Sequence, residues 1–192
     1  MMWVLDVTAQ RCDTPDLVQD RILDAAEELI CTRGITGFTL DGVAQEAGVS
    51  KGGLLYHFRS KDSLISGMQR RMASHMAETL TEARAGSEPV LQAFVRHLRR
   101  DYERGGRSFA PLLLAREREE PCEELRALMA CIARESGDGD GKGAPLLLLA
   151  ALGLMLASLA RLPFPLPEHA SDLLDELESA AGRIGDVGSQ AV

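Results

Sequence analysis

Two short stretches with helical patterns are separated in this chain by only three residues. Residues 40–47 place apolar side chains at helical spacing and are followed by Gly48, and the next stretch carries Leu54 and Phe58. Glycine is a typical residue just after a helix because it adopts left-handed backbone conformations at little cost. The spacer, residues 48–50, leaves room for one sharp turn, so the two helices must pack against each other. This layout predicts a helix-turn-helix.

The rest of the chain repeats the helical spacing and shows no alternation long enough to build a sheet. Proline precedes several of these patterns, which suits a first helical turn because no amide hydrogen bond is lost there. The expected helices cover about residues 15–33, 39–47, 51–58, 60–85, 89–102, a short segment after Pro111, a helix opened by Pro121, 145–161 and 167–184.

An all-α chain is therefore expected: N-terminal helices that contain the helix-turn-helix, followed by a longer helical part. The glycine-rich segment 136–143 fits neither a phosphate-binding loop nor a calcium loop, and we interpret it as a flexible linker. The expected parts are an N-terminal arm (1–14), the helix-turn-helix domain (15–60), the regulatory domain (61–184) and a disordered tail (185–192).

Composition limits the compartment and the chemistry that we expect. Apolar residues make up 45% of the 192 residues, enough for a core without disulfides. The 4 cysteines form no paired motif, which favours a reducing compartment and no zinc site. The N-terminal residues lack the basic start and long apolar stretch of a secretory signal. We expect a cytoplasmic protein with no metal and no cofactor.

One apolar run, residues 144–160, carries no charge and approaches the roughly 17 to 25 residues of a membrane-spanning helix. It contains an early proline and is bounded by a glycine-rich loop and a proline-rich turn. A helix that is apolar on all sides is equally explained by burial between helices or at a subunit interface. We therefore expect no membrane span.

The net charge of −8 argues at first against a nucleic-acid partner, because neutralising phosphate requires lysine and arginine. The charge is unevenly distributed, however. Between residues 50 and 71 five basic side chains face a single acid, Asp62, whereas acidic residues gather in segment 117–124. A local basic segment can bind phosphate whatever the total charge.

Lys51 and Lys61 are both expected in the first turn of a helix, where the positive end of the helix dipole disfavours a cation. A DNA phosphate would compensate, because free amides at a helix start bind an anion and a nearby lysine adds to the attraction. The alternative is a pair of solvated surface lysines, at a cost of about a few tenths of a kcal/mol each.

Gly52 and Gly53 lie inside the second of the two short helices, where each glycine costs roughly 0.5 to 1 kcal/mol relative to alanine. A helix without side chains there can bring its backbone close to the wall of a DNA groove; a loosely formed helix start is the alternative. Tyr56 and His57 stand near the end of this helix. Either could donate to phosphate, and His57 could instead pack at the helix junction.

Taken together, residues 21–64 resemble the DNA-binding domain of the TetR family of bacterial repressors. The shared features are the alanines of the first helix, the spacing of Gly34 and Thr39, the segments AGVSKG and LYHF, and the SK that follows. The resemblance covers about the first third of the chain. It implies a three-helix DNA reader, a long connecting helix, and a C-terminal domain that dimerises and binds a small effector.

The resemblance also implies which residues contact the DNA. By position, the phosphate contacts are Thr39, Tyr56, His57 and Lys61, and the residues facing the major groove are Ser50, Lys51, Gly52 and Gly53. Leu55 departs from the family, which often has a second aromatic residue there, although a leucine can meet a thymine methyl group. Lys51 is then the best candidate for a contact to guanine, and DNA shape carries much of the specificity.

The remaining two thirds match no motif. The apolar run 146–160 and a later apolar stripe within residues 173–184 suit a four-helix interface between two copies. A monomer's own core is the alternative. Methionine-rich, aromatic-poor walls suit an adaptable pocket for an apolar effector, but the same residues also fit a plain core. The stripe is Leu173, Leu174, Leu177, Ala181 and Ile184, and the expected pocket residues are Met72, Met76, Phe94, Leu98, Tyr102, Phe109 and Leu113.

These expectations combine into a repressor that dimerises on a palindromic operator. Its two recognition helices must lie about 34 Å apart to enter successive major grooves, and an effector that favours another spacing releases the DNA. One alternative keeps the DNA-binding domain and gives the C-terminal half a protein partner instead of a small ligand. An enzyme is less favoured because the sequence contains no nucleophile motif, metal-ligand spacing or nucleotide loop.

Overall fold

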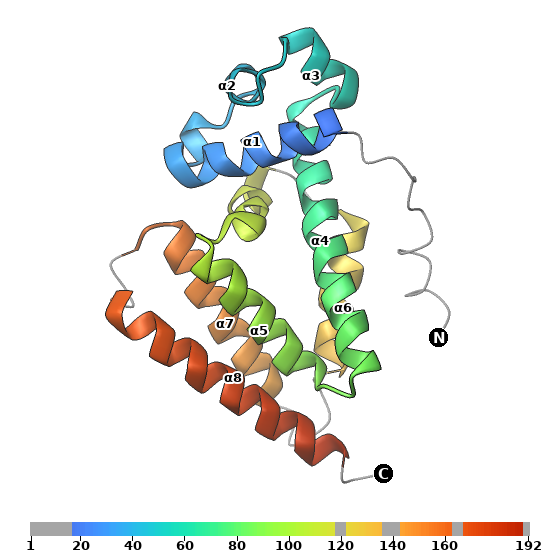
Figure 1. The fold of residues 1–192 in the computed structure, drawn as a ribbon, viewed down its shortest axis with the longest axis vertical. Coiled ribbons are helices and arrows are strands. Elements are labelled where there is room, and N and C mark those ends of the chain that lie inside the picture. The colour runs from blue at the N-terminus through green and yellow to red at the C-terminus, as the bar shows by residue number, and fades with distance from the viewer. Residues whose placement is uncertain (1–16, 118–121, 136–142, 163–166, 190–192) are drawn as a thin grey trace. The chain divides into compact units, whose positions relative to one another are not determined.

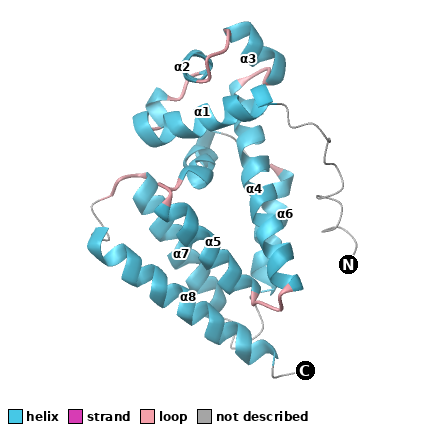
Figure 2. Ribbon diagram, in the orientation of Figure 1, coloured by secondary structure: helices cyan, strands magenta, loops and turns pink. Residues whose placement is uncertain are grey.

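A computed structural model of the chain describes residues 17–117, 122–135, 143–162 and 167–189 (Figure 1). Within these ranges the chain is helical apart from short connecting turns, and no strand occurs, so the expected all-α fold is confirmed (Figure 2). The elements are α1 (Leu17–Arg33), the 3-10 turn η1 (Ile35–Gly37), α2 (Leu40–Glu46), α3 (Lys51–His57), α4 (Lys61–Ala85), α5 (Val90–Glu103), the 3-10 helix η2 (Arg107–Glu117), α6 (Glu123–Glu135), α7 (Gly143–Leu159) and α8 (Pro167–Ser189).

The helices pack into two compact units. The N-terminal unit comprises residues up to 74 together with 110–125, and the C-terminal unit comprises 75–109 together with the chain from 126 onward. The long helix α4 contributes its first half to the N-terminal unit and its second half to the C-terminal unit.

The N-terminal unit is built around α1, which buries Ile22, Ala26 and Leu29 completely. These residues recur at the three- and four-residue spacing of one helix face. The first half of α4 approaches α1 and α3 closely: a Cβ added to Gly67 would lie 2.6 Å from a ring carbon of Phe58. Residues 61–74 therefore pack with the helix-turn-helix helices, because a glycine at the crossing lets the backbones come together.

Glycine ends α1 and α2 as the sequence predicts. Gly34 follows α1 with φ 70°, and Gly48 follows α2 with φ 65°, both in the left-handed region that favours glycine. Arg21 of α1 donates to the backbone carbonyl of Ala47 at 2.7 Å, which satisfies a carbonyl left open at the end of α2. The expected start of the first helix, near Thr14, lies outside the described residues.

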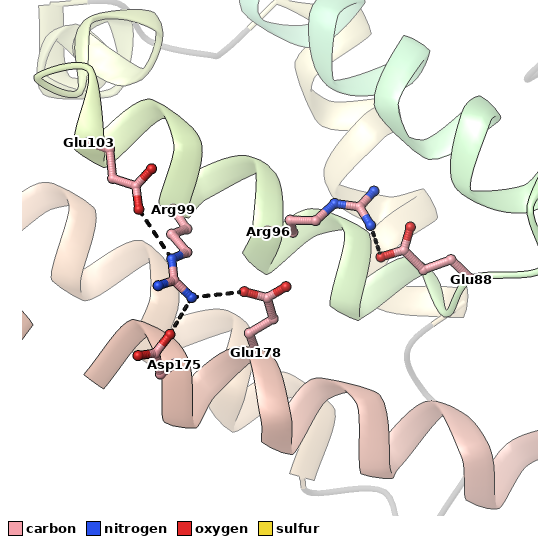
Figure 3. Close-up of polar contacts among 6 residues, drawn as sticks. All are labelled: Glu88, Arg96, Arg99, Glu103, Asp175 and Glu178. Carbon is pink, nitrogen blue, oxygen red and sulfur yellow. Dashed lines mark hydrogen bonds and ion pairs between the residues drawn. The ribbon is translucent and has the colours of Figure 1, made fainter. Parts of the chain in front are cut away.

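The C-terminal unit contains α5, α7 and α8, which pack against one another (Figure 1). Phe94 and Leu98 of α5 are fully buried, as is Ala181 of α8. An ionic cluster joins the same helices: Arg99 of α5 pairs with Asp175 and Glu178 of α8 and with Glu103 of its own helix (Figure 3). The contact between α5 and α8 is therefore both apolar and charged.

Three element boundaries differ from the sequence expectation. The segment expected after Pro111 is a 3-10 helix that begins earlier, at Arg107, and contains that proline, because a carboxylate of α5 caps its start. Helix α7 begins at Gly143. Helix α8 continues to Ser189, into the expected tail, since glycines cost a helix only about 1 kcal/mol each whereas proline would stop it. The linker residues 136–142 lie outside the described ranges.

The apolar helix α7 buries one face and exposes the other. Ala151 and Met155 are buried at 1% exposure, whereas Leu146 and Leu149 are 68% and 69% exposed. Across the described ranges, no helix combines the length and the apolar character that a bilayer span requires. Within one chain, therefore, only one face of this apolar helix is buried, and the other face remains exposed.

Candidate nucleic-acid interface

Two side-chain caps fix the starts of α2 and α3. Thr39 Oγ1 accepts a hydrogen bond from the Gly42 amide at 3.1 Å, and Ser50 Oγ accepts one from the Gly53 amide at 3.0 Å. Threonine and serine are preferred at this position because they satisfy an amide that the helix itself leaves open. Both residues were predicted as DNA contacts, and both are exposed while capping.

Helix α3 is anchored by two apolar side chains and turns the rest of its surface outward. Leu54 is fully buried and Phe58, directly after the helix, is 3% exposed. Lys51 and Gly52 are exposed, and Tyr56 is 83% exposed. A tyrosine this exposed is unusual for an aromatic residue and is available to a partner. The structure therefore puts the predicted groove-facing start of α3 on the surface.

The other predicted residues of α3 are only partly accessible. Gly53, Leu55 and His57 are half-buried. The His57 ring packs edge-on against the Tyr56 ring, with 5.1 Å between the ring centroids. The His57 ring thus lies beside the exposed Tyr56 ring at the end of α3.

Lys51 has a partner that the sequence analysis missed. Its Nζ lies 2.9 Å from Oδ1 and 3.0 Å from Oδ2 of Asp41, and both side chains are exposed. The signal was available, because an acid in the first turn of α2 complements the helix dipole. The Asp41 carboxylate offsets the unfavourable position of Lys51 at the start of α3. The sequence analysis had considered a DNA phosphate for this compensating role.

Lys61 lies at the start of α4 with its Nζ 5.3 Å from the centroid of the Phe38 ring. This is a cation–π distance, and it holds a half-buried lysine beside the first turn. The same turn carries a reciprocal cap: Ser60 Oγ accepts from the Ser63 amide, and Ser63 Oγ accepts from the Ser60 amide, each at 3.0 Å. The two predicted lysines are thus both positioned by neighbouring side chains.

Other chemistry is sparse in the part of the chain that the structure describes. There, no group of three His, Cys, Asp or Glu side chains is arranged to hold a metal ion. Cys31, Cys122 and Cys131 form no disulfide. Burial raises the pKa of Cys122 above its ordinary value, which favours the protonated thiol.

The residues predicted to line an effector pocket fall in both units. Met76, Phe94, Leu98 and Phe109 are buried in the C-terminal unit, and Tyr102 is half-buried there. Met72, which is buried, and Leu113, which is half-buried, belong to the N-terminal unit. The predicted set is therefore not one cluster within a single unit.

Comparison with known protein families places the helix-turn-helix in a recognised group. The family described as "Bacterial regulatory proteins, tetR family" matches residues 22–68, which run from α1 into α4. The transcriptional regulator RutR of Escherichia coli strain K12 is 30% identical over 134 residues, covering 64% of this chain and 61% of RutR. The chain spans 37 to 61% of the length of the first curated relatives that it matches.

Solved structures extend the likeness to most of the chain. A member of the TetR family from Streptomyces coelicolor A3 is similar with a TM-score of 0.56 and 26% identity, covering 85% of this chain and 98% of that one. The multidrug-binding protein EbrR in complex with ethidium is similar with a TM-score of 0.50 and 26% identity, covering 85% of this chain and 99% of EbrR.

Proposed function

Residues 22–68 are a helix-turn-helix domain of the TetR family of bacterial regulatory proteins, and on that basis we propose that this chain is a DNA-binding transcriptional repressor. It acts as a homodimer in the cytoplasm and leaves a palindromic operator when a small apolar effector binds. The observation that carries the proposal is the exposed start of α3. The buried side chains of Leu54 and Phe58 anchor this helix so that its first residues face solvent. The related proteins are transcriptional regulators, and the proposal gives the chain no catalytic role.

The contact residues follow from this exposure. Lys51, Gly52 and Gly53 at the start of α3 face the major groove together with the capping Ser50, and Leu55 meets a thymine methyl group. Phosphates are held by the remaining predicted residues, which come from α2, α3 and α4. These are Thr39, Tyr56, His57 and Lys61.

The homodimer is supported by an exposed apolar seam on α7. Its members recur at alternating spacings of three and four residues, the pattern of a helix that packs lengthwise on another helix. A second exposed or half-buried seam runs along α8, and four such helices from two copies form a bundle. The α7 seam is Leu146, Leu149, Gly153 and Leu156, and the α8 seam is Leu173, Leu177, Ala180 and Ile184.

Effector release is supported by the likeness to EbrR, which was solved with ethidium bound. For this chain we assign the effector to the C-terminal unit, with Met76, Phe94, Leu98, Tyr102 and Phe109 as candidate wall residues. An effector that binds better to a dimer with wrongly spaced recognition helices lowers the affinity for the operator. The operator lowers the affinity for the effector by the same factor.

The proposal is tested by DNA binding as a function of salt. Fluorescence anisotropy is measured with duplexes from the region upstream of the chain's own coding sequence and with a random duplex of equal length. We expect the logarithm of the affinity to fall linearly and steeply with the logarithm of salt concentration, because each phosphate contact releases counterions. Absence of binding to every duplex at low salt, or affinity that does not respond to salt, rules out the proposed function.

Lys61 and Lys51 are expected to differ when each is replaced by alanine. Lys61→Ala weakens binding to all sequences alike and lowers the salt slope by about 1 per protomer, because it removes a phosphate contact. Lys51→Ala relaxes sequence preference, at a cost of about 1 to 3 kcal/mol on the preferred site. Arg183→Ala, an exposed change in α8, serves as the control. Equal and sequence-blind losses from both lysine variants would remove Lys51 from the reading role.

Gly52→Ala separates the stability of α3 from its function. A Cβ at this position meets only Ser50 Oγ, at 3.9 Å, so the fold should gain about 0.5 to 1 kcal/mol. If the bare backbone presses against a groove wall, operator affinity falls by about tenfold or more while stability rises, since the added methyl group stands in the contact. Urea unfolding and anisotropy on the same preparation give both numbers, and unchanged DNA affinity contradicts the close approach.

A further inference from the structure

A group of polar side chains lies within the C-terminal unit, where α4, α5 and the start of η2 meet. His97 Nδ1 of α5 lies 2.9 Å from Thr79 Oγ1 of α4. The His97 ring also packs edge-on against Phe109, with 6.1 Å between the ring centroids. One turn further along α5, Asp101 accepts hydrogen bonds from the amide and the hydroxyl of Ser108. The group thus combines a carboxylate, an imidazole and a hydroxyl beside an aromatic ring.

The Asp101 carboxylate is only half used. Both bonds from Ser108 go to Oδ1, whereas Oδ2 is buried and has no hydrogen-bond partner in the described chain. A cap at the start of η2 requires one oxygen, which asparagine or serine would supply equally well. A buried carboxylate oxygen without a donor is unfavourable, and such atoms in native proteins call for an explanation. Oδ2 therefore suits a donor that comes from outside the chain.

The groups described around Asp101 leave its Oδ2 atom without a hydrogen-bond donor. Burial lowers the pKa of His97 below its ordinary value, although the Asp101 carboxylate acts in the opposite direction. The imidazole is accordingly neutral at pH 7 and does not neutralise the carboxylate. The other charged or titratable groups that influence His97 are His75 of α4 and Arg100 and Arg104 at the end of α5, and all three are exposed to solvent.

We propose that Asp101 anchors an effector that carries a protonated amine on an apolar body. The N–H groups of the amine donate to Oδ2, its charge compensates the carboxylate, and its apolar body lies against Phe109 and the neighbouring buried side chains of α5. The inference deepens the proposed function and rests on it for the regulatory meaning of the site. The binding itself is a separate claim.

The position of Asp101 on α5 also connects ligand binding to the proposed dimer interface. Arg99, two residues earlier on α5, binds Asp175 and Glu178 of α8 (Figure 3). A ligand that inserts beside Asp101 must displace packed side chains of α5, and the ionic cluster passes a shift of α5 to α8. Helix α8 carries part of the proposed dimer seam, so occupation of the site favours a different dimer spacing.

Three indole compounds of similar shape test the charge preference directly, without DNA. Calorimetric titration compares tryptamine, which carries an ammonium group, with the neutral alcohol tryptophol and the anionic indole-3-acetate. We expect tryptamine to bind the intact chain at least about tenfold more tightly than the other two, a difference of about 1.4 kcal/mol. Equal binding of the three compounds, or no binding of tryptamine at concentrations up to about 10 mM, overturns the proposal.

Asp101→Asn is the decisive variant, because its Oδ1 still accepts from Ser108 while an amide nitrogen replaces Oδ2. We expect it to lose at least about tenfold in tryptamine affinity and to bind DNA as the parent chain does. Asp172→Asn, an exposed change in α8, is the matched control and should leave both unchanged. Unchanged tryptamine affinity in Asp101→Asn contradicts the anchoring role.

Ser108→Ala separates capping from binding should Asp101→Asn lose stability. It weakens the start of η2 but leaves Asp101 Oδ2 in place, so preference for tryptamine over tryptophol should persist. Loss of that preference in a folded Ser108→Ala variant would contradict direct binding of the amine by Oδ2. Failure of the proposed function is seen separately, because it abolishes DNA binding while amine binding is measured on the protein alone.

Discussion

Replacing Leu149 by arginine is expected to convert the proposed dimer into a monomer and to weaken operator binding by about 100-fold or more, since a monomer loses the second half-site. Leu149 is 69% exposed in the middle of the α7 seam. An arginine there would place a charge in the apolar centre of the proposed four-helix interface, where it has no partner and cannot reach water. Sedimentation velocity reports the oligomeric state, and anisotropy reports DNA affinity.

Ser171→Arg is the control for Leu149→Arg, because Ser171 is an exposed polar residue of α8 outside the seam. It adds the same charge to the same unit and should change neither the oligomeric state nor DNA affinity. A parent chain that sediments as a monomer, or a Leu149→Arg variant that still dimerises, would show that the α7 seam is covered by something other than a second copy.

Replacing Arg71 by alanine is expected to destabilise the N-terminal unit by about 3 kcal/mol, as breaking a buried ion pair leaves an uncompensated charge. The guanidinium reaches from α4 to two acids of α1: Nη1 lies 2.7 Å from Asp24 Oδ1, and Nη2 lies 2.8 Å from Glu27 Oε1. The Arg71 and Glu27 side chains are only 15% and 11% exposed. Glu27 would therefore lose its contact with Arg71 at a site that water reaches poorly.

Urea unfolding of the whole chain measures this loss, with Arg70→Ala as the control because Arg70 is the exposed neighbour of Arg71. The control should lie within about 0.5 kcal/mol of the parent chain. Replacing Glu27 by leucine together with Arg71 by methionine should recover much of the stability, because apolar residues of similar volume fill the same space without charge. A loss below about 0.5 kcal/mol for Arg71→Ala would mean that the pair contributes nothing measurable.

The helix-turn-helix was predictable because its signals are local. Thr39 and Ser50 cap the helices that directly follow them, and Gly34 and Gly48 end the helices that precede them. Each signal acts within one turn of the chain, so it can be recognised in the sequence without knowledge of the fold. The predicted placement of Lys51 and Gly52 on an exposed helix start follows from the same local rules.

The partners of charged side chains were not predictable in this way. Lys51 meets Asp41 ten residues away, and Arg99 meets Glu178 seventy-nine residues away. Helical periodicity gives the face on which a residue lies but not which other helix covers that face. The buried, unpaired Oδ2 of Asp101 was not predictable for the same reason, because it depends on which side chains reach that oxygen.

The amino-acid order alone determined the helices of the DNA reader, their ends, and the residues on its outer surface, because these depend on contacts within one or two turns. Only tertiary packing decided how α4 is shared between two units, which acids hold Lys51 and Arg71, and which face of α7 stays uncovered. Such features depend on contacts between residues far apart in the chain, and those contacts exist only once the helices have packed.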